Sequence, residues 1–202
     1  MSQCAVAQKK QSRKKLLATL RESLETSTPV QLRRAVEPEE VLQGVALELS
    51  EDWVLLAGLR EGAYLNGYQI LRVKDLVDVV PETRFLPFLQ RRRPWPPARP
   101  AVDLELSDLR SIITAGAAAA EVVSISRETK RPGTVLIGAP IEWTRKSLWL
   151  LPITPQCRWE QHLVQVKLKD LTQVGFGGDY EAAVLDVAGP VPPRTDPAPA
   201  LT

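Results

Sequence analysis

An internal repeat constrains the fold of this chain more than any other feature of its sequence. Residues 41–44 (VLQG) are matched by residues 135–138 (VLIG), at a shift of 94 positions. Residues 73–76 (VKDL) are matched by residues 168–171 (LKDL), at a shift of 95. One inserted residue across about forty aligned positions is a strong repeat, and it predicts two copies of one small domain.

A proline-rich stretch divides the two copies. Residues 94–100 (PWPPARP) have the composition of a semi-rigid linker and fall where the repeat predicts a boundary. A unit of about 80 residues buries a limited core, so we expect the copies to pack as a pseudo-twofold pair with equivalent sheet edges side by side. The predicted order is a basic flexible N-terminus (1–12), repeat 1 (13–93), a Pro-rich linker (94–103), repeat 2 (104–188) and a disordered tail (189–202).

Each copy has the pattern of one helix, five short strands and a closing helix. Leucines recur every four residues over residues 16–24, which predicts an amphipathic helix. Residues 45–49 alternate between apolar and polar, whereas the continuously apolar residues 53–59 favour a strand buried on both faces. Further strands are predicted at residues 30–33, 68–73, 77–80, 123–126, 134–143, 147–153, 163–168 and 172–174. A capped helix is predicted after residues 107–108, and closing helices are predicted at residues 85–89 and 180–187.

This pattern is mainly β with flanking helices (α+β), and it resembles the plan of Sm-like and SH3-like small barrels. The short turn that separates the fourth and fifth strands in those barrels matches residues 74–76 and 169–171, both KDL. The resemblance implies two tandem five-stranded small barrels. Residues 53–55 (WVL) and 148–150 (LWL) also resemble the WYL domain, a bacterial ligand-sensing barrel, and residues 174–180 (VGFGGDY) are similar to the end of uncharacterised bacterial proteins.

Charge and cysteine content favour a cytoplasmic protein of bacterial type. The net charge of +2 is nearly neutral and does not by itself indicate a nucleic-acid-binding protein. Two cysteines, Cys4 and Cys157, do not make a disulfide framework, which fits a reducing compartment. We find neither an apolar run long enough to span a membrane nor the pattern of a signal peptide.

No catalytic or metal-binding signature stands out from the sequence. His162 and Cys157 form the one nucleophile–base combination, but no third group that would orient them is indicated, so a small hydrolase is the weakest hypothesis. We predict no cofactor and no metal site. The matched acids Asp75 and Asp170 are interpreted as turn residues that accept backbone hydrogen bonds.

The basic segments are the best candidates for binding a partner. Arg91, Arg92, Arg93 and Arg99 surround Trp95, and arginine next to an aromatic ring suits phosphate contact and base stacking. The alternative is a solvated linker next to a basic helix end. Other candidate contact residues are Arg72, Lys74, Lys167 and Lys169 at equivalent strand ends, and Arg158 with Trp159, which we expect to be an exposed aromatic contact.

The sequence therefore predicts a non-catalytic binding module for RNA, DNA or a protein partner. The alternative is a ligand-sensing domain with a pocket between the two barrels, in the manner of the WYL domain. Self-association through barrel edges is a further expectation.

Overall fold

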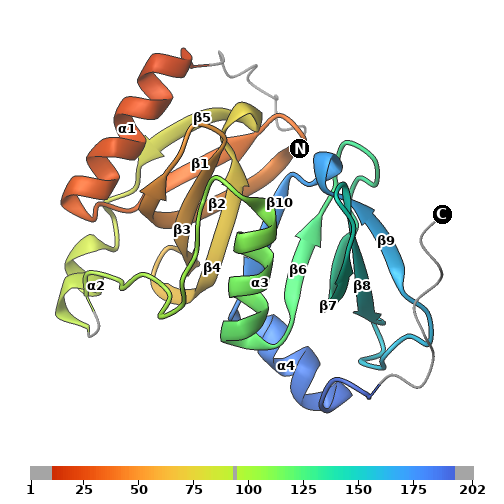
Figure 1. The fold of residues 1–202 in the computed structure, drawn as a ribbon. Helices are drawn as coiled ribbons and strands as arrows, with labels where there is room; N and C mark the ends of the chain where they lie inside the picture. Colours follow the sequence, from red (N-terminus) through yellow and green to blue (C-terminus); the bar gives the residue numbers. More distant parts are fainter. Residues whose placement is uncertain (1–10, 93–94, 194–202) are drawn as a thin grey trace, which may run out of the picture.

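The structure of the chain is a computed structural model that describes residues 11–92 and 95–193. Within these ranges one antiparallel sheet of ten strands carries four α-helices (Figure 1). The first half holds α1 (Arg13–Thr26), β1 (Val30–Arg34), β2 (Glu37–Leu49), β3 (Trp53–Arg60), β4 (Tyr64–Arg72), the 3-10 turn η1 (Val73–Asp75), β5 (Leu76–Pro81) and α2 (Leu86–Arg91). The second half holds α3 (Leu109–Ala120), β6 (Val123–Ser126), β7 (Val135–Trp143), β8 (Ser147–Ile153), β9 (Val164–Lys167), the turn η2 (Leu168–Asp170), β10 (Gln173–Phe176) and α4 (Asp179–Ala188).

The predicted class, mainly β with flanking helices, is confirmed, and most element boundaries lie within a few residues of the prediction. The predicted cap before the second long helix is present, since the Asp108 side chain accepts two backbone hydrogen bonds at the start of α3. At the start of α1 the Ser12 side chain accepts a hydrogen bond from the Lys15 backbone N–H, a cap that the sequence analysis did not predict. Predictions that concern residues 1–10, Arg93, Pro94 and residues 194–202 lie outside the described residues.

The strands follow the order β5-β1-β2-β3-β4-β10-β6-β7-β8-β9. Both halves have the same internal order, in which the fifth strand of the half (β5 or β10) lies beside the first, and the second, third and fourth strands follow. The sheet is open, because β5 and β9 are its two ends, and two closed five-stranded barrels are not seen. The halves meet where β4 pairs with β10, through four residue pairs from Gln173–Leu71 to Phe176–Tyr68.

This junction shows that the expected pseudo-twofold arrangement is wrong. A twofold axis pairs a strand with its own equivalent. Here the fourth strand of the first half pairs with the fifth strand of the second half, so the halves are joined head to tail. The next joint of the same kind would use β9 of one chain and β5 of another.

Strand β3 is buried on both faces, as its continuous apolar run predicts. Val54 and Leu56 belong to a core that includes residues of α1. Trp53 and Leu55 belong to a second core, which includes residues of α3 and β10 and Leu106, just after the linker. Because neighbouring side chains of a strand point to opposite faces, β3 contributes to both cores and holds the two halves together.

A buried ion pair also joins the halves at one end of the junction. Arg34, at the end of β1, is 1% exposed, and Glu128, just after β6, is 6% exposed. Arg34 Nη2 donates to Glu128 Oε1 at 2.8 Å and also to Glu40. The Thr172 hydroxyl donates to the other oxygen of Glu128. Nε and Nη1 of Arg34 are buried and make no hydrogen bond among the described residues, so the charge of Arg34 depends on its two carboxylate partners.

The glycines matched by the repeat are needed for close strand contact. A Cβ at Gly44 would lie 2.7 Å from the carbonyl oxygen of Ala57, and a Cβ at Gly138 would lie 2.2 Å from that of Leu151. Both positions lie in the second strand of their half and face the third strand. The match between the copies therefore reflects a packing requirement of the fold.

Candidate functional site

An open hollow lined by arginine and aromatic side chains lies between α2 and the hairpin that joins β3 to β4. Its volume is about 290 Å³, near the lower end for ligand sites. It includes Arg92 and Trp95, which the sequence analysis singled out, and Arg60 and Tyr64, which it did not. The lining residues are Arg60, Ala63, Tyr64, Leu65, Leu89, Arg92 and Trp95.

The two arginines lie over aromatic rings. The Arg92 guanidinium is 5.6 Å from the centre of the Tyr64 ring and 5.2 Å from that of Phe88. Arg60 lies 5.7 Å from the centre of the Tyr64 ring. Tyr64 and Phe88 meet edge to face at 5.9 Å. Such cation–π and edge contacts hold the charged groups and the rings close together, and the Tyr64 side chain still exposes 41% of its surface.

Local sequence features place these side chains. Glu61 and Gly62 both have positive φ angles, +56° and +70°, so the hairpin turns sharply and brings Arg60 and Tyr64 close together. Pro87 lies in the first turn of α2, a position that proline tolerates. Leu89 of α2 is buried in a small cluster of apolar side chains against which Trp95 packs. Trp95 therefore forms part of the floor of the hollow, with its ring half-buried.

The second half of the chain reaches the rim of this hollow. Arg60 Nη1 donates to Asp179 Oδ2 at 2.6 Å, across the head-to-tail junction. The Asn66 side chain accepts a hydrogen bond from the Asp179 backbone N–H at 2.7 Å, and so caps the start of α4. Glycines 177 and 178 precede this helix, and Gly178 is its N-cap residue. Asp179 offsets part of the positive charge of Arg60, and Arg92 supplies the cation farther from that carboxylate.

Nearby linker residues are fixed to β2 and β4. The Tyr68 hydroxyl donates to the Ala98 carbonyl oxygen at 3.2 Å, and burial raises the pKa of this phenol above its ordinary value. Arg99 forms an ion pair with Glu48. Arg99 is thus a structural cation of the linker.

Arg72 is not a surface contact residue. Its Nε donates to Asp75 Oδ2 at 2.6 Å, and both side chains are largely buried. Asp75 therefore accepts from an arginine side chain, where the sequence suggested backbone donors. Lys74, in the same turn, is exposed.

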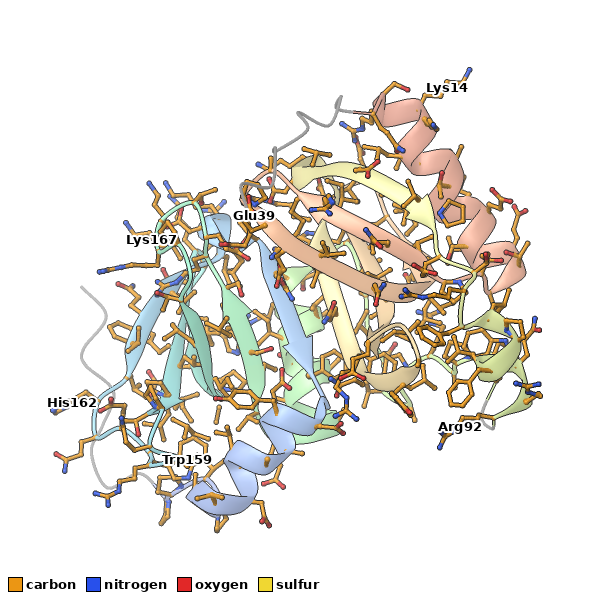
Figure 2. The ribbon with its side chains drawn as sticks, turned by 180° about the vertical axis from the view of Figure 1, so that it is seen from behind. Lys14, Glu39, Arg92, Trp159, His162 and Lys167 are labelled. Atoms are coloured by element: carbon orange, nitrogen blue, oxygen red, sulfur yellow. The ribbon has the colours of Figure 1, made fainter. Side chains whose placement is uncertain are left out.

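The remaining predicted cations do not lie beside the hollow. Lys167 and Lys169 are exposed. The backbone N–H of Leu168, which lies between them in the sequence, donates to the carbonyl oxygen of Lys146 in the β7–β8 hairpin. Figure 2 shows Arg92, Lys167 and Trp159 in three separate regions of the molecule. The predicted contact residues therefore do not form one surface, and the structure brings together Arg92 and Trp95, with exposed Arg91 on the same helix.

Trp159 differs from its predicted role as an exposed aromatic contact. It is half-buried, it packs against a cluster that contains Ile137 and Val184, and its indole N–H donates to the Gly189 carbonyl oxygen at 3.0 Å. The ring therefore attaches the end of α4 to the second half. The neighbouring Arg158 is exposed.

The possible catalytic pair shows no joint arrangement. Cys157 lies half-buried in a turn with φ +54°, and its neighbours include the same cluster that holds Trp159. His162 is exposed and lines a different hollow, which Cys157 does not line. Among the described residues no group of three or more His, Cys, Asp or Glu side chains is placed to hold a metal ion.

Comparisons with protein-family models, with curated proteins and with solved structures gave no match for this chain. No helix among residues 11–92 and 95–193 is both long enough and apolar enough to cross a membrane. The arguments for function therefore rest on the geometry of the chain itself.

Proposed function

We propose that this protein is a non-catalytic binding module that takes a single-stranded nucleic acid in the hollow between α2 and the β3–β4 hairpin. One observation carries the proposal: Arg92 lies over the rings of Tyr64 and Phe88 in an open hollow whose floor includes Trp95. Arginines beside stacking rings are the combination that binds sugar–phosphate backbone and bases together.

The exposed ring of Tyr64 favours single strands over duplex. Bases must be unstacked to lie on an aromatic side chain, and in single strands this requires little disruption of pairing. The guanidinium groups of Arg60 and Arg92 lie 5.7 Å and 5.6 Å from the centre of that ring, and we expect Arg92, and Arg60 on release from Asp179, to contact phosphate oxygens. The exposed Leu65 widens the apolar part of the same surface.

A salt titration tests this function directly. We expect the full chain to bind a fluorescently labelled single-stranded RNA or DNA, with an association constant that falls steeply as salt concentration rises. Two phosphate contacts predict a slope of about −1.4 for log K against log salt, since each contact on single strands contributes about −0.7. Absence of binding to both RNA and DNA at low salt, or binding that salt does not change, would contradict the proposal and leave a protein as the partner to be sought.

The ligand-sensing alternative requires a pocket between the two halves. Along the described junction that space holds the shared core and the buried pair of Arg34 and Glu128, so no observation favours this alternative. We further propose that the protein is cytoplasmic and that its two halves are diverged copies of one small-barrel unit. The matched glycines, the matched KDL turns and the identical strand order support the duplication.

A further inference from the structure

The head-to-tail junction inside the chain leaves a matching pair of strand edges at its two ends. β9 is the fourth strand of its half, as β4 is, and β5 is the fifth strand of its half, as β10 is. In the described residues neither outer edge is paired with another strand. A heterologous contact of this type repeats from copy to copy, and it generates a ring or an open chain of molecules.

We propose that a second copy of this chain docks its β9 edge on β5, and that Gln11, which occupies the same edge, must leave first. This inference uses residues remote from the hollow, so it stands or falls independently of nucleic-acid binding.

Hydrogen bonds at the two equivalent edges indicate that Gln11 and a docked β9 would use the same backbone groups of β5. At the internal junction, the Arg72 backbone N–H donates to the Thr172 carbonyl oxygen at 3.2 Å. The repeat places Val77 at the position of Thr172. The Val77 carbonyl oxygen accepts from the Gln11 backbone N–H at 3.1 Å, and the Val79 N–H donates to the Gln11 side chain at 3.3 Å. Gln11 therefore contacts the outer edge of β5 at the position where β4 contacts the edge of β10.

The helix that lies over β5 does not prevent docking. α3 packs on β10 and β6, and α1 packs on β5 and β2 in the corresponding way. At the internal junction β10 pairs with β4 although α3 covers the face of β10. By the same geometry β5 can pair with β9 of another copy while α1 stays on its face. The contact would be short, but the internal junction also uses only four residue pairs.

Charge at the two edges is complementary, with the same polarity as at the internal junction. Inside the chain, an acid of the downstream half, Glu128, pairs with Arg34 of the upstream half. In the proposed contact Arg127 takes the place of Arg34, and Ala35 of the next copy takes the place of Glu128. The acids of the next copy are Glu37 and Glu39, which begin β2 just after Ala35, and we expect them to attract Arg127.

Lys167 offers a specific test of the edge. It occupies the position of Arg72, so its backbone N–H is the donor that we expect to reach Val77 of the next copy. Its φ is −74°, close to the value that proline requires. Lys167→Pro should therefore remove the outward donor without distorting the strand, and Lys167→Ala is the matched control that loses only the lysine side chain.

The experiment measures the mass of the protein against concentration by sedimentation velocity. Deletion of residues 1–11 leaves Ser12, the cap of α1, in place. We expect this deletion to lower the concentration for half-association at least about tenfold relative to the full chain and to a chain that lacks only residues 1–8, a change equivalent to ~1.4 kcal/mol. Lys167→Pro in the deleted chain should abolish association, whereas Lys167→Ala should retain it.

Charge exchange tests the direction of docking. A variant with Arg127→Glu and Lys169→Glu and a variant with Glu37→Lys and Glu39→Lys, both in the deleted chain, should each be monomeric alone and should associate when mixed. A deleted chain that is folded and monomeric at every concentration overturns the proposal, as does association that Lys167→Pro leaves unchanged. If the deletion unfolds the chain, Gln11→Pro in the full chain removes the same donor, and a monomeric Gln11→Pro variant would contradict the proposal equally.

Discussion

Replacing Glu128 with alanine is expected to lower the free energy of unfolding by about 3–5 kcal/mol, the usual cost of removing one partner of a buried ion pair. Arg34 is 1% exposed, and without Glu128 its charge would keep Glu40 as its one carboxylate partner among the described residues. The Thr172 hydroxyl would also lose the oxygen to which it donates. Chemical denaturation followed by circular dichroism measures the change.

Two comparisons separate this effect from a general loss of charge. Glu160→Ala removes an exposed acid of the same half and should change stability by less than about 0.5 kcal/mol. The double variant Arg34→Met with Glu128→Met should be less destabilised than the sum of the two single variants, because it leaves no unpaired charge in the interior. Equal stability of Glu128→Ala and Glu160→Ala would show that the pair does not hold the halves together.

Replacing Tyr64 with alanine is expected to weaken binding of a single-stranded oligonucleotide by roughly ten- to a hundredfold, since one stacked base contributes about 1–3 kcal/mol. Arg92→Ala should lower the affinity at low salt and reduce the slope of log K against log salt by about 0.7. The double variant with both changes removes the ring and the cation that lies over it. Fluorescence anisotropy with one labelled oligonucleotide measures the affinity of the two single variants and of the double variant.

Arg84 provides a matched control for Arg92. It is exposed, it precedes α2, and its guanidinium lies 4.7 Å from the centre of the Phe85 ring, but it does not line the hollow. Arg84→Ala removes the same charge and should leave the affinity within about twofold of the unchanged chain, as expected for a cation outside the contact. If Arg84→Ala and Arg92→Ala weaken binding equally, the attraction comes from overall charge and the hollow has no special role.

Local patterns predicted the elements of this fold well. The leucine spacing of α1, the Asp108 cap of α3 and the KDL turns that became η1 and η2 are set by neighbouring residues. The long apolar run of β3 correctly indicated burial on both faces. What covers its second face could not be predicted, because the covering residues come from α3 and the linker, more than forty positions away in the sequence.

The head-to-tail joint was beyond sequence reasoning for a physical reason. The sequences of β4 and β10 do not indicate that these two strands pair, because side-chain pattern specifies which face of a strand is buried and not which edge is paired. The burial of the Arg34–Glu128 ion pair could not be predicted either, because charged residues near strand ends are usually solvated. Both features depend on how the two copies meet.

The candidate site was found in part. The density of arginine around Trp95 pointed to the correct segment, but Arg60 and Tyr64 gave no sign of belonging to it. They are brought to α2 by the sharp turn at Glu61 and Gly62, and only the folded chain shows that closeness. Trp159 shows the opposite error: a tryptophan beside an arginine resembles a contact residue, yet it attaches α4 to the sheet.

Photo-crosslinking reports where on the protein the nucleic acid lies, so it tests whether the hollow between α2 and the β3–β4 hairpin is the binding site. A single-stranded RNA that carries 4-thiouridine is irradiated with the full chain, and the crosslinked peptides are identified by mass spectrometry. Binding in the hollow should give crosslinks on the segments that contain Tyr64 and Trp95, and an unlabelled oligonucleotide that competes should remove them. Crosslinks confined to the distant segment around Lys167, with none at the hollow, would contradict it.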